Sequence, residues 1–153
     1  MTTYKTIVGI DPDSKAHGVA IWRDGMLSEL QMLTTIQVYH YLKLSRANDL
    51  LVSIENVLKQ NFVYTRNAKA SKAAHAKVAL SVGRCQQAQQ ELMNWLDHLG
   101  VKYVLHPPQA ANWAKNRAYF AKVTGWTKQS NEDTRSAAYF GFLEARKWTT
   151  PSN

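Results

Sequence analysis

Two short apolar segments of the chain each end in a carboxylate, and this feature constrains the fold more than any other. The sequence TIVGID covers residues 6–11 and LLVSIE covers residues 50–55, so the two acids are Asp11 and Glu55. Apolar segments of this length are typical of buried strands. A charge beside a core is costly unless it is paired, hydrated or bound to a cation. The fold must therefore give both acids a partner.

The rest of the pattern predicts further strands and several helices. Strands are expected at 4–11, 17–23, 26–33, 50–55 and 101–106. Helices are expected at about 34–48, 68–98 and 131–147, with one or two short helices within 109–123. Asp24-Gly25 is a strong hairpin signal between the second and third strands. This order predicts an α/β fold with a five-stranded mixed sheet flanked by helices, in a single domain over residues 1–153.

The long helix carries apolar residues three, four or seven positions apart, namely Val78, Val82, Cys85, Leu92 and Leu99. Its glutamines are expected on the other sides of the helix: Gln86, Gln87, Gln89 and Gln90. Gly100 follows and is expected to end the helix. The apolar stripe suits either the core of one chain or the interface of a dimer, and periodicity alone does not separate the two.

The formal net charge is +8, and basic residues are concentrated in stretches that contain no acid. Residues 56–90 hold six of them: Lys59, Arg66, Lys69, Lys72, Lys77 and Arg84. Residues 98–131 hold five more, again without an acid. A polyanion such as nucleic acid is the natural partner of such surfaces, and a basic protein without a nucleic-acid role is the alternative.

Several classes of protein are disfavoured by the composition. No apolar stretch approaches the roughly 20 residues of a membrane span, and Met1 leads into polar residues instead of a signal-peptide core. Cys85 is the one cysteine, so we expect no internal disulfide and a reducing compartment such as the cytoplasm. The five histidines lack zinc-ligand spacing. We expect no membrane partner and no small-molecule cofactor.

The acids of the chain are expected to meet at one edge of the sheet. Binding sites of open α/β sheets form outside the carboxyl ends of the strands, where Asp11 and Glu55 would lie side by side. The last helix brings Glu132 and Asp133 in its first turn, and Asp133 shares a helix face with Ser136. Neighbouring carboxylates raise each other's pKa unless a cation lies between them, and Mg²⁺ is a hard ion that carboxylates and phosphates bind.

Each acid also has an ordinary structural explanation. Asp11 begins the segment Asp11-Pro12-Asp13-Ser14, which is common turn chemistry, and Glu55 could be a solvated strand end. Acids in the first turn of a helix gain about 0.3–1 kcal/mol from the helix dipole, which accounts for Glu132 and Asp133. Taken together with the basic stretches, the acids favour a shared metal site.

Four segments form a recognisable set when they are taken in order. They are GIDPDSKAHGVAI with Asp11, VSIEN with Glu55, the long helix continuing into HPPQAANWA, and TGWTKQSNEDTRSAA with Asp133. This set resembles the RuvC-type Holliday junction resolvases of bacteria and phages, over about residues 6–145. The resemblance implies a ribonuclease H-like fold, a homodimer, and two Mg²⁺-dependent nicks placed symmetrically in a four-way DNA junction.

The resemblance also implies roles for individual residues. Asp11 matches the family's first catalytic aspartate, Glu55 its second acid and Asp133 its third position. These three residues would hold two Mg²⁺ ions, which Mn²⁺ can replace. The expected DNA contacts follow Glu55 and continue along the long helix: Lys59, Phe62, Tyr64, Arg66, Lys69, Lys72, Lys77 and Arg84. Phe62 and Tyr64 either stack on unpaired bases at the crossover or pack beneath their loop.

Two departures from the family pattern leave the activity open. Ser136 stands where relatives usually carry a fourth acid, and Asp13 replaces the usual glycine of the first loop. Asp13 or Glu132 could supply the missing negative charge. The alternatives to a junction resolvase are therefore a weakened or inactive junction-binding protein of the same fold, and a related nuclease acting on flaps or other branched DNA.

Overall fold

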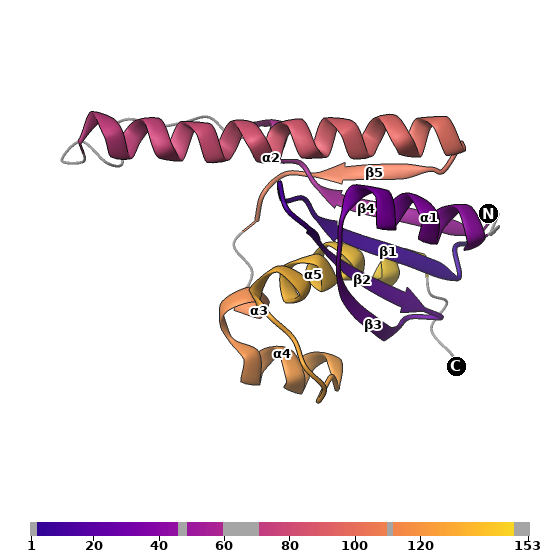
Figure 1. Cartoon of the computed structure of the whole chain (residues 1–153). Coiled ribbons are helices and arrows are strands. Elements are labelled where there is room, and N and C mark those ends of the chain that lie inside the picture. Colours follow the sequence, from indigo (N-terminus) through magenta and orange to yellow (C-terminus); the bar gives the residue numbers. More distant parts are fainter. Residues whose placement is uncertain (1–2, 46–48, 60–70, 110–111, 149–153) are drawn as a thin grey trace.

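Five strands form one mixed sheet in a computed structural model that describes residues 3–45, 49–59, 71–109 and 112–148 (Figure 1). The strand order is β3-β2-β1-β4-β5. The bounds are Thr6–Asp11 for β1, His17–Arg23 for β2, Met26–Leu33 for β3, Leu50–Glu55 for β4 and Tyr103–His106 for β5. β2 is antiparallel to β1 and β3, whereas β4 is parallel to β1 and β5. The predicted five-stranded mixed sheet is confirmed.

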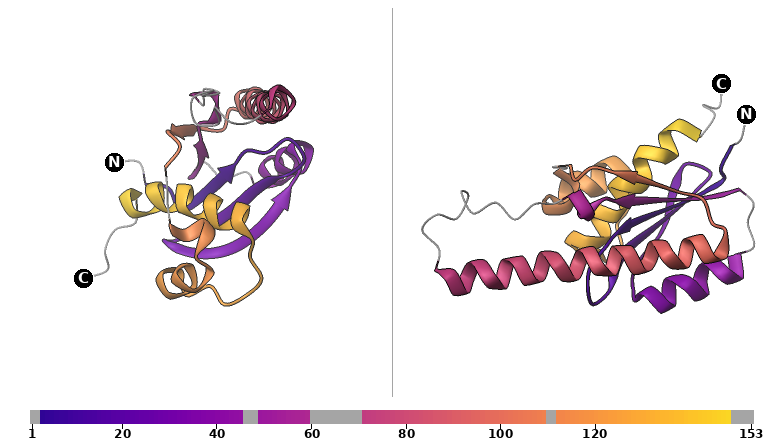
Figure 2. Two further views of the ribbon diagram at one scale, coloured as in Figure 1. Left: turned by 90° about the vertical axis from the view of Figure 1, so that its left-hand side faces the viewer. Right: turned by 90° about the horizontal axis from the view of Figure 1, so that it is seen from above.

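Helices cover both faces of this sheet (Figure 2). One face carries α1 and α2, and the other carries α3, α4 and α5. The bounds are Thr35–Ser45 for α1, Lys72–Leu99 for α2, Asn112–Lys115 for α3, Arg117–Thr124 for α4 and Glu132–Trp148 for α5, with a 3-10 turn, η1, at Val57–Lys59. No helix in the described part of the chain is long and apolar enough to span a membrane.

The two faces of the sheet have separate cores. The core beneath α1 and α2 contains aliphatic residues of the strands and helices, among them Ile10, Ile54 and Leu92. The core beneath α5 is more aromatic and contains Trp22, Trp113 and Phe120. Successive residues of a strand face opposite sides, so the residues that follow Ile10 and Ile54 belong to the face that carries α5. Those residues are Asp11 and Glu55.

Most element ends agree with the sequence pattern, and the exceptions have local causes. The β2–β3 hairpin has φ of 50° at Asp24 and 78° at Gly25, as expected for an Asp-Gly turn. β5 starts at Tyr103 and not at residue 101, because the backbone N–H of Val101 donates to the carbonyl of Leu96 and completes the end of α2.

The first strand and the first helix are both shorter than expected. β1 starts at Thr6 and not at residue 4, because the Tyr4 ring packs edge-on against Trp148 instead of continuing the strand. α1 is capped by Thr34, since its hydroxyl accepts from the backbone N–H of Gln37. The helix reaches Ser45, and the expected extension to residue 48 lies outside the described residues.

α2 has one buried half and one exposed half. It begins at Lys72, capped by the Ser71 hydroxyl, and the expected start at residue 68 lies outside the described residues. Leu92 packs into the core, whereas Val78 is 42% exposed on the half that extends beyond the sheet (Figure 1). The apolar stripe therefore serves the monomer core at its C-terminal end. A dimer interface along its N-terminal end stays a prediction.

α5 lies directly on β1 and β2 because glycines leave room for its backbone. A Cβ at Gly9 would lie 2.6 Å from the backbone nitrogen of Gly141, and a Cβ at Gly18 would lie 2.5 Å from the carbonyl carbon of Asp133. Neither distance accommodates a real side chain. The strand register pairs Gly18 with Asp11. The contact at Gly18 therefore sets how closely the first turn of α5 approaches Asp11.

Candidate active site

Asp11 and Glu55 end neighbouring parallel strands at the same edge of the sheet. The register pairs Ile10 of β1 with Ile54 of β4, so the next residue of each strand lies beside the other. Both acids are half-buried. The structure thus brings together the two carboxyl groups with which the sequence argument began.

The surroundings of Asp11 favour its protonated form. Burial is the largest cause, and the charge of Glu55 together with a hydrogen bond between the two carboxyl groups raises the pKa further. A hydrogen bond with the Ser136 side chain lowers the pKa, and the charge of Asp133 raises it. The result is a pKa of about 8, compared with an ordinary value of 3.8. Without a cation, the pair keeps a proton at neutral pH.

The first turns of α5 bring two more predicted residues to this carboxyl pair. Ser136 is hydrogen-bonded to Asp11, and Asp133 lies close enough for its charge to act on Asp11. The pKa of Asp133 is itself raised, first by burial and then by the charges of Asp13 and Glu132. Glu132 is exposed to solvent. Asp13 and Glu132 therefore act on Asp133, whereas Glu55 and Asp133 act on Asp11.

His17 supports the loop that follows Asp11, and the sequence argument missed it. It is 1% exposed, and its Nδ1 accepts a hydrogen bond from the backbone N–H of Asp13 at 3.1 Å. Nε2 therefore carries the proton and donates to the Thr35 hydroxyl at 2.8 Å. Burial lowers the pKa of His17 to about 4, although the charge of Asp13 opposes this shift. A neutral imidazole thus ties the loop to the start of α1.

The middle of α2 passes beside the same loop. The pKa of the Cys85 thiol is raised first by burial, then by the charge of Asp13 and to a lesser extent by those of Asp11 and Asp133. A hydrogen bond with the backbone of Ser14 opposes these effects. The interactions place the middle of this basic helix next to the acidic edge of the sheet.

Gln89 is a correction to the expected pattern of α2. It is fully buried, at 0% exposure, and does not lie on a solvent-facing side. Its side-chain oxygen accepts from the backbone N–H of Val57 at 2.7 Å, and its amide donates to Asn56 Oδ1 at 3.1 Å. Buried backbone groups need hydrogen-bond partners, and the chain directly after Glu55 obtains them from this glutamine. Gln89 therefore fixes the segment that leaves the candidate site.

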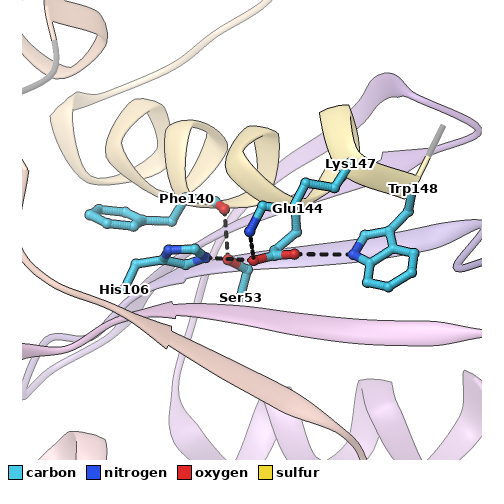
Figure 3. Close-up of polar contacts among 6 residues, drawn as sticks. All are labelled: Ser53, His106, Phe140, Glu144, Lys147 and Trp148. Atoms are coloured by element: carbon cyan, nitrogen blue, oxygen red, sulfur yellow. Dashed lines mark hydrogen bonds and ion pairs between the residues drawn. The ribbon is translucent and has the colours of Figure 1, made fainter. Parts of the chain in front are cut away.

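A buried polar cluster joins β5 to α5 (Figure 3). Its centre is Glu144, whose side chain is only 5% exposed. The carboxylate accepts hydrogen bonds from His106 Nε2 at 2.9 Å, Lys147 Nζ at 3.1 Å and Trp148 Nε1 at 3.0 Å. A buried carboxylate needs such partners to offset its lost hydration. The cluster therefore holds the end of β5 against α5.

This cluster helps to position Glu55 of the candidate site. The β4–β5 register pairs Glu55 with His106, and the backbone N–H of Asn56 donates to the His106 carbonyl at 2.7 Å. Two residues before Glu55, the Ser53 hydroxyl donates to the Phe140 carbonyl at 2.7 Å (Figure 3). Both contacts anchor the end of β4, so the position of Glu55 is determined by β5 and by α5.

The carboxyl pair suits a hard cation. Asp11 and Glu55 offer only oxygen ligands, and the pKa of Asp11 is raised first by burial and then by the charge of Glu55, both of which a bound cation would oppose. Mg²⁺ is usually held by one or two carboxylates together with substrate phosphate, so the pair fits one such ion. Within residues 3–45, 49–59, 71–109 and 112–148, no group of three or more His, Cys, Asp or Glu side chains could hold a metal ion by itself. Asp133 is nearby without completing a three-carboxylate cluster.

The predicted DNA contacts divide into two groups. Lys72, Lys77 and Arg84 are exposed on the N-terminal half of α2. The side chains of the others lie outside the described residues: Lys59, Phe62, Tyr64, Arg66 and Lys69.

Comparison with known proteins gives matches among solved structures. No protein-family profile and no curated protein matches the sequence. RuvC of T. thermophilus in complex with a Holliday junction substrate matches with a TM-score of 0.62 and 15% identity over 93% of each chain. A second structure, of Thermus thermophilus RuvC, matches with a TM-score of 0.57 and 16% identity over 92% of this chain and 93% of that chain. The chain thus has the fold of these RuvC structures, and the predicted ribonuclease H-like fold is confirmed.

Proposed function

We propose that this chain is a structure-selective endonuclease that resolves four-way DNA junctions by paired hydrolysis of phosphodiester bonds. The observation that carries the proposal is the carboxyl pair of Asp11 and Glu55, hydrogen-bonded to Ser136, at the strand edge of a fold shared with RuvC. Two adjacent acids, of which Asp11 has a raised pKa, are suited to cations and, through them, to phosphate oxygens.

In this proposal Asp11 would help to hold both Mg²⁺ ions, Glu55 would hold one of them and Asp133 would hold the other. Bound divalent ions would activate a water molecule and stabilise the charge that develops on the phosphate oxygens. The protein's own contribution is to hold these carboxylates in place before the substrate arrives. His17 fixes the loop after Asp11, and Gln89 fixes the segment after Glu55.

The N-terminal half of α2 is the proposed surface for DNA and for a second subunit. Its exposed cations, Lys72, Lys77 and Arg84, would contact phosphates, which gives affinity without sequence preference. Val78 and Leu80 on the same half are 42% and 55% exposed, which supports a two-fold dimer with two symmetric sites. The proposed setting is the cytoplasm of a bacterium or of a phage-infected host.

The decisive experiment is cleavage of a synthetic four-way junction, labelled on each strand in turn, with Mg²⁺ or Mn²⁺. We expect paired nicks at symmetric positions, with linear duplex of the same sequence left intact. Asp11→Asn should abolish nicking and leave junction binding unchanged or tighter, because it removes a ligand and a negative charge while the basic surface remains. Nicking by Asp11→Asn at the wild-type rate would show that the site lies elsewhere.

A second candidate is a junction-binding protein that does not cleave. It is favoured by one observation, the hydroxyl of Ser136 at the position where a fourth acid is expected. Tight junction binding without nicks in either metal would establish this function. Cleavage of flaps and forks in preference to four-way junctions would instead indicate a branched-DNA nuclease of the same fold.

A further inference from the structure

An aromatic groove lies on the α5 face of the sheet, at the opposite end of the strands from the acidic site. Its volume is about 370 Å³, within the range of natural ligand sites. Its walls include Trp22, Trp113, Trp126 and Phe142, and its rim includes Met26 and Val123. Asp11 lies at the end of β1 that pairs with Gly18 of β2. The groove adjoins the hairpin at the other end of these two strands, where Thr6 pairs with Arg23. A ligand bound here would leave the acidic site open.

The floor of the groove is a cluster of aromatic rings that are tilted against one another. The Phe142 ring lies 5.1 Å from Trp113 and 5.9 Å from Trp22, measured between ring centroids. Trp22 and Trp113 are each 5% exposed, so the protein core holds them. Rings that are packed in this way lose little conformational entropy when a ligand binds.

The rim of the groove exposes apolar side chains to water. Met26 on the hairpin is 73% exposed, and Val123 on α4 is 46% exposed. Tyr119, one turn before Val123, is 44% exposed. Clustered exposed apolar side chains at the mouth of a groove mark interaction surfaces more often than isolated ones do.

Two cations flank the rings of the groove, and one acid, Asp24, lies in the adjoining hairpin. None of the residues that line it is charged, and two cations lie over its rings. Lys128 Nζ is 5.7 Å from the Trp126 ring centre, and the Arg146 guanidinium is 5.9 Å from the Phe142 ring centre. The groove therefore offers an apolar cavity flanked by two cations, which is complementary to an apolar group next to negative charges.

The polar groups that line the groove already have hydrogen-bond partners, which limits the kind of group that can enter it. Trp22 Nε1 donates to the Ala138 carbonyl at 3.1 Å, and the Thr124 hydroxyl donates to the Phe120 carbonyl at 2.7 Å. Trp126 Nε1 likewise donates to a backbone carbonyl of its own loop, at 3.1 Å. A nucleobase would bury polar edges against groups that are already bonded, which is unfavourable. An aliphatic or aromatic amino-acid side chain carries no such edge.

We propose that this groove docks an acidic segment of a partner protein. One bulky apolar side chain of the segment occupies the cavity between Trp113, Trp126 and Phe142, and neighbouring carboxylates of the segment pair with Lys128 and Arg146. The interaction tethers the chain to its partner from the face opposite α2. The proposal does not depend on nuclease activity.

The probe is a short fluorescein-labelled peptide in which one Phe follows a run of Asp, and binding is measured by fluorescence anisotropy. A peptide with Ser in place of Phe should bind about tenfold more weakly, because the apolar side chain supplies the buried area. Val123→Glu should weaken binding about tenfold by placing a like charge at the rim, and Lys128→Glu about fivefold by reversing a flanking charge. Melting temperatures establish that both variants are folded.

Matched controls come from the other face of the sheet. Lys43 Nζ lies 5.8 Å over the Tyr39 ring on α1, and Ile36 on the same helix is 50% exposed. Lys43→Glu and Ile36→Glu therefore repeat the two changes away from the groove, and binding should change less than about twofold.

Four results would overturn the proposal. One is absence of peptide binding, and another is equal binding of the Phe and Ser peptides. A third is a loss of binding in Lys43→Glu as large as that in Lys128→Glu, which would indicate attraction by overall charge. A labelled single-stranded oligonucleotide is the competing probe. If Val123→Glu weakens its binding more than Ile36→Glu does, the groove belongs to a nucleic-acid surface and the peptide proposal is rejected.

Discussion

Replacing Gly18 with alanine should move Asp133 and Ser136, on α5, away from Asp11 on the sheet. The new Cβ would lie 2.5 Å from the carbonyl carbon of Asp133, whereas ordinary contact begins at 3.4 Å, so the first turn of α5 has to move by about 1 Å. Overpacking of this kind costs about 1–3 kcal/mol of stability. The same movement carries Asp133 and Ser136 away from Asp11. Misplacement of reacting groups by about 1 Å can lower a rate by about 100-fold.

Gly83→Ala is the matched control for this substitution. A Cβ at Gly83 meets nothing within 4 Å, and the residue lies inside α2. Alanine is favoured over glycine in a helix by about 0.5–1 kcal/mol, so the melting temperature should rise. The same substitution, glycine to alanine, is thus expected to lower the melting temperature at residue 18 and to raise it at residue 83.

Thermal unfolding and junction cleavage with saturating Mg²⁺ are measured on both variants at a temperature where each is folded. The reasoning is refuted if Gly18→Ala melts and cleaves like the wild type. If its melting temperature falls while its cleavage rate is unchanged, the contact stabilises the fold but does not set the geometry of the site.

Three further predictions concern the acids and the basic helix. The folded chain holds a proton on Asp11 up to about pH 8 and the unfolded chain only to 3.8, so metal-free stability should fall as pH rises between these values. In Asp11→Asn the metal-free stability should depend less on pH, so the melting temperature should change less between these pH values than in the wild type. Ser136→Asp should raise Mg²⁺-dependent cleavage at least about tenfold, or about 1.4 kcal/mol of barrier, by adding a charged ligand; an unchanged rate would refute this role. The logarithm of junction affinity should fall with the logarithm of salt concentration by about 0.9 per phosphate contact, and Lys77→Glu should make the slope shallower by about 1; a slope near zero in the wild type would refute the polyanion surface.

The meeting of Asp11 and Glu55 could be predicted because it depends on local patterns. Apolar segments of strand length fix which residues end the strands, and parallel strands bring their carboxyl ends to one edge. The helix face shared by Asp133 and Ser136 also follows from spacing alone, and Ser136 does bond to Asp11.

The residues that hold the acids in place could not be predicted in the same way. Gln89 is one of several glutamines on α2, and its partners are the side-chain oxygen of Asn56 and the backbone N–H of Val57, far away in the sequence. Glu144 lies on α5, and its hydrogen-bond partner His106 lies on β5, far away in the sequence. Periodicity describes one element at a time, so partners from a different element leave no signal in it.

The position of α5 in the chain has a consequence for synthesis on the ribosome. Polypeptides emerge from their N-terminus, so β1, β4 and the basic helix α2 are made well before residues 132–148. Until α5 settles on Gly9 and Gly18, Asp11 has neither Ser136 nor Asp133 beside it, and the aromatic face of the sheet is uncovered. A nascent chain therefore displays its cations before its acidic site is complete. The order of translation itself delays the assembly of the site until the last described helix has docked.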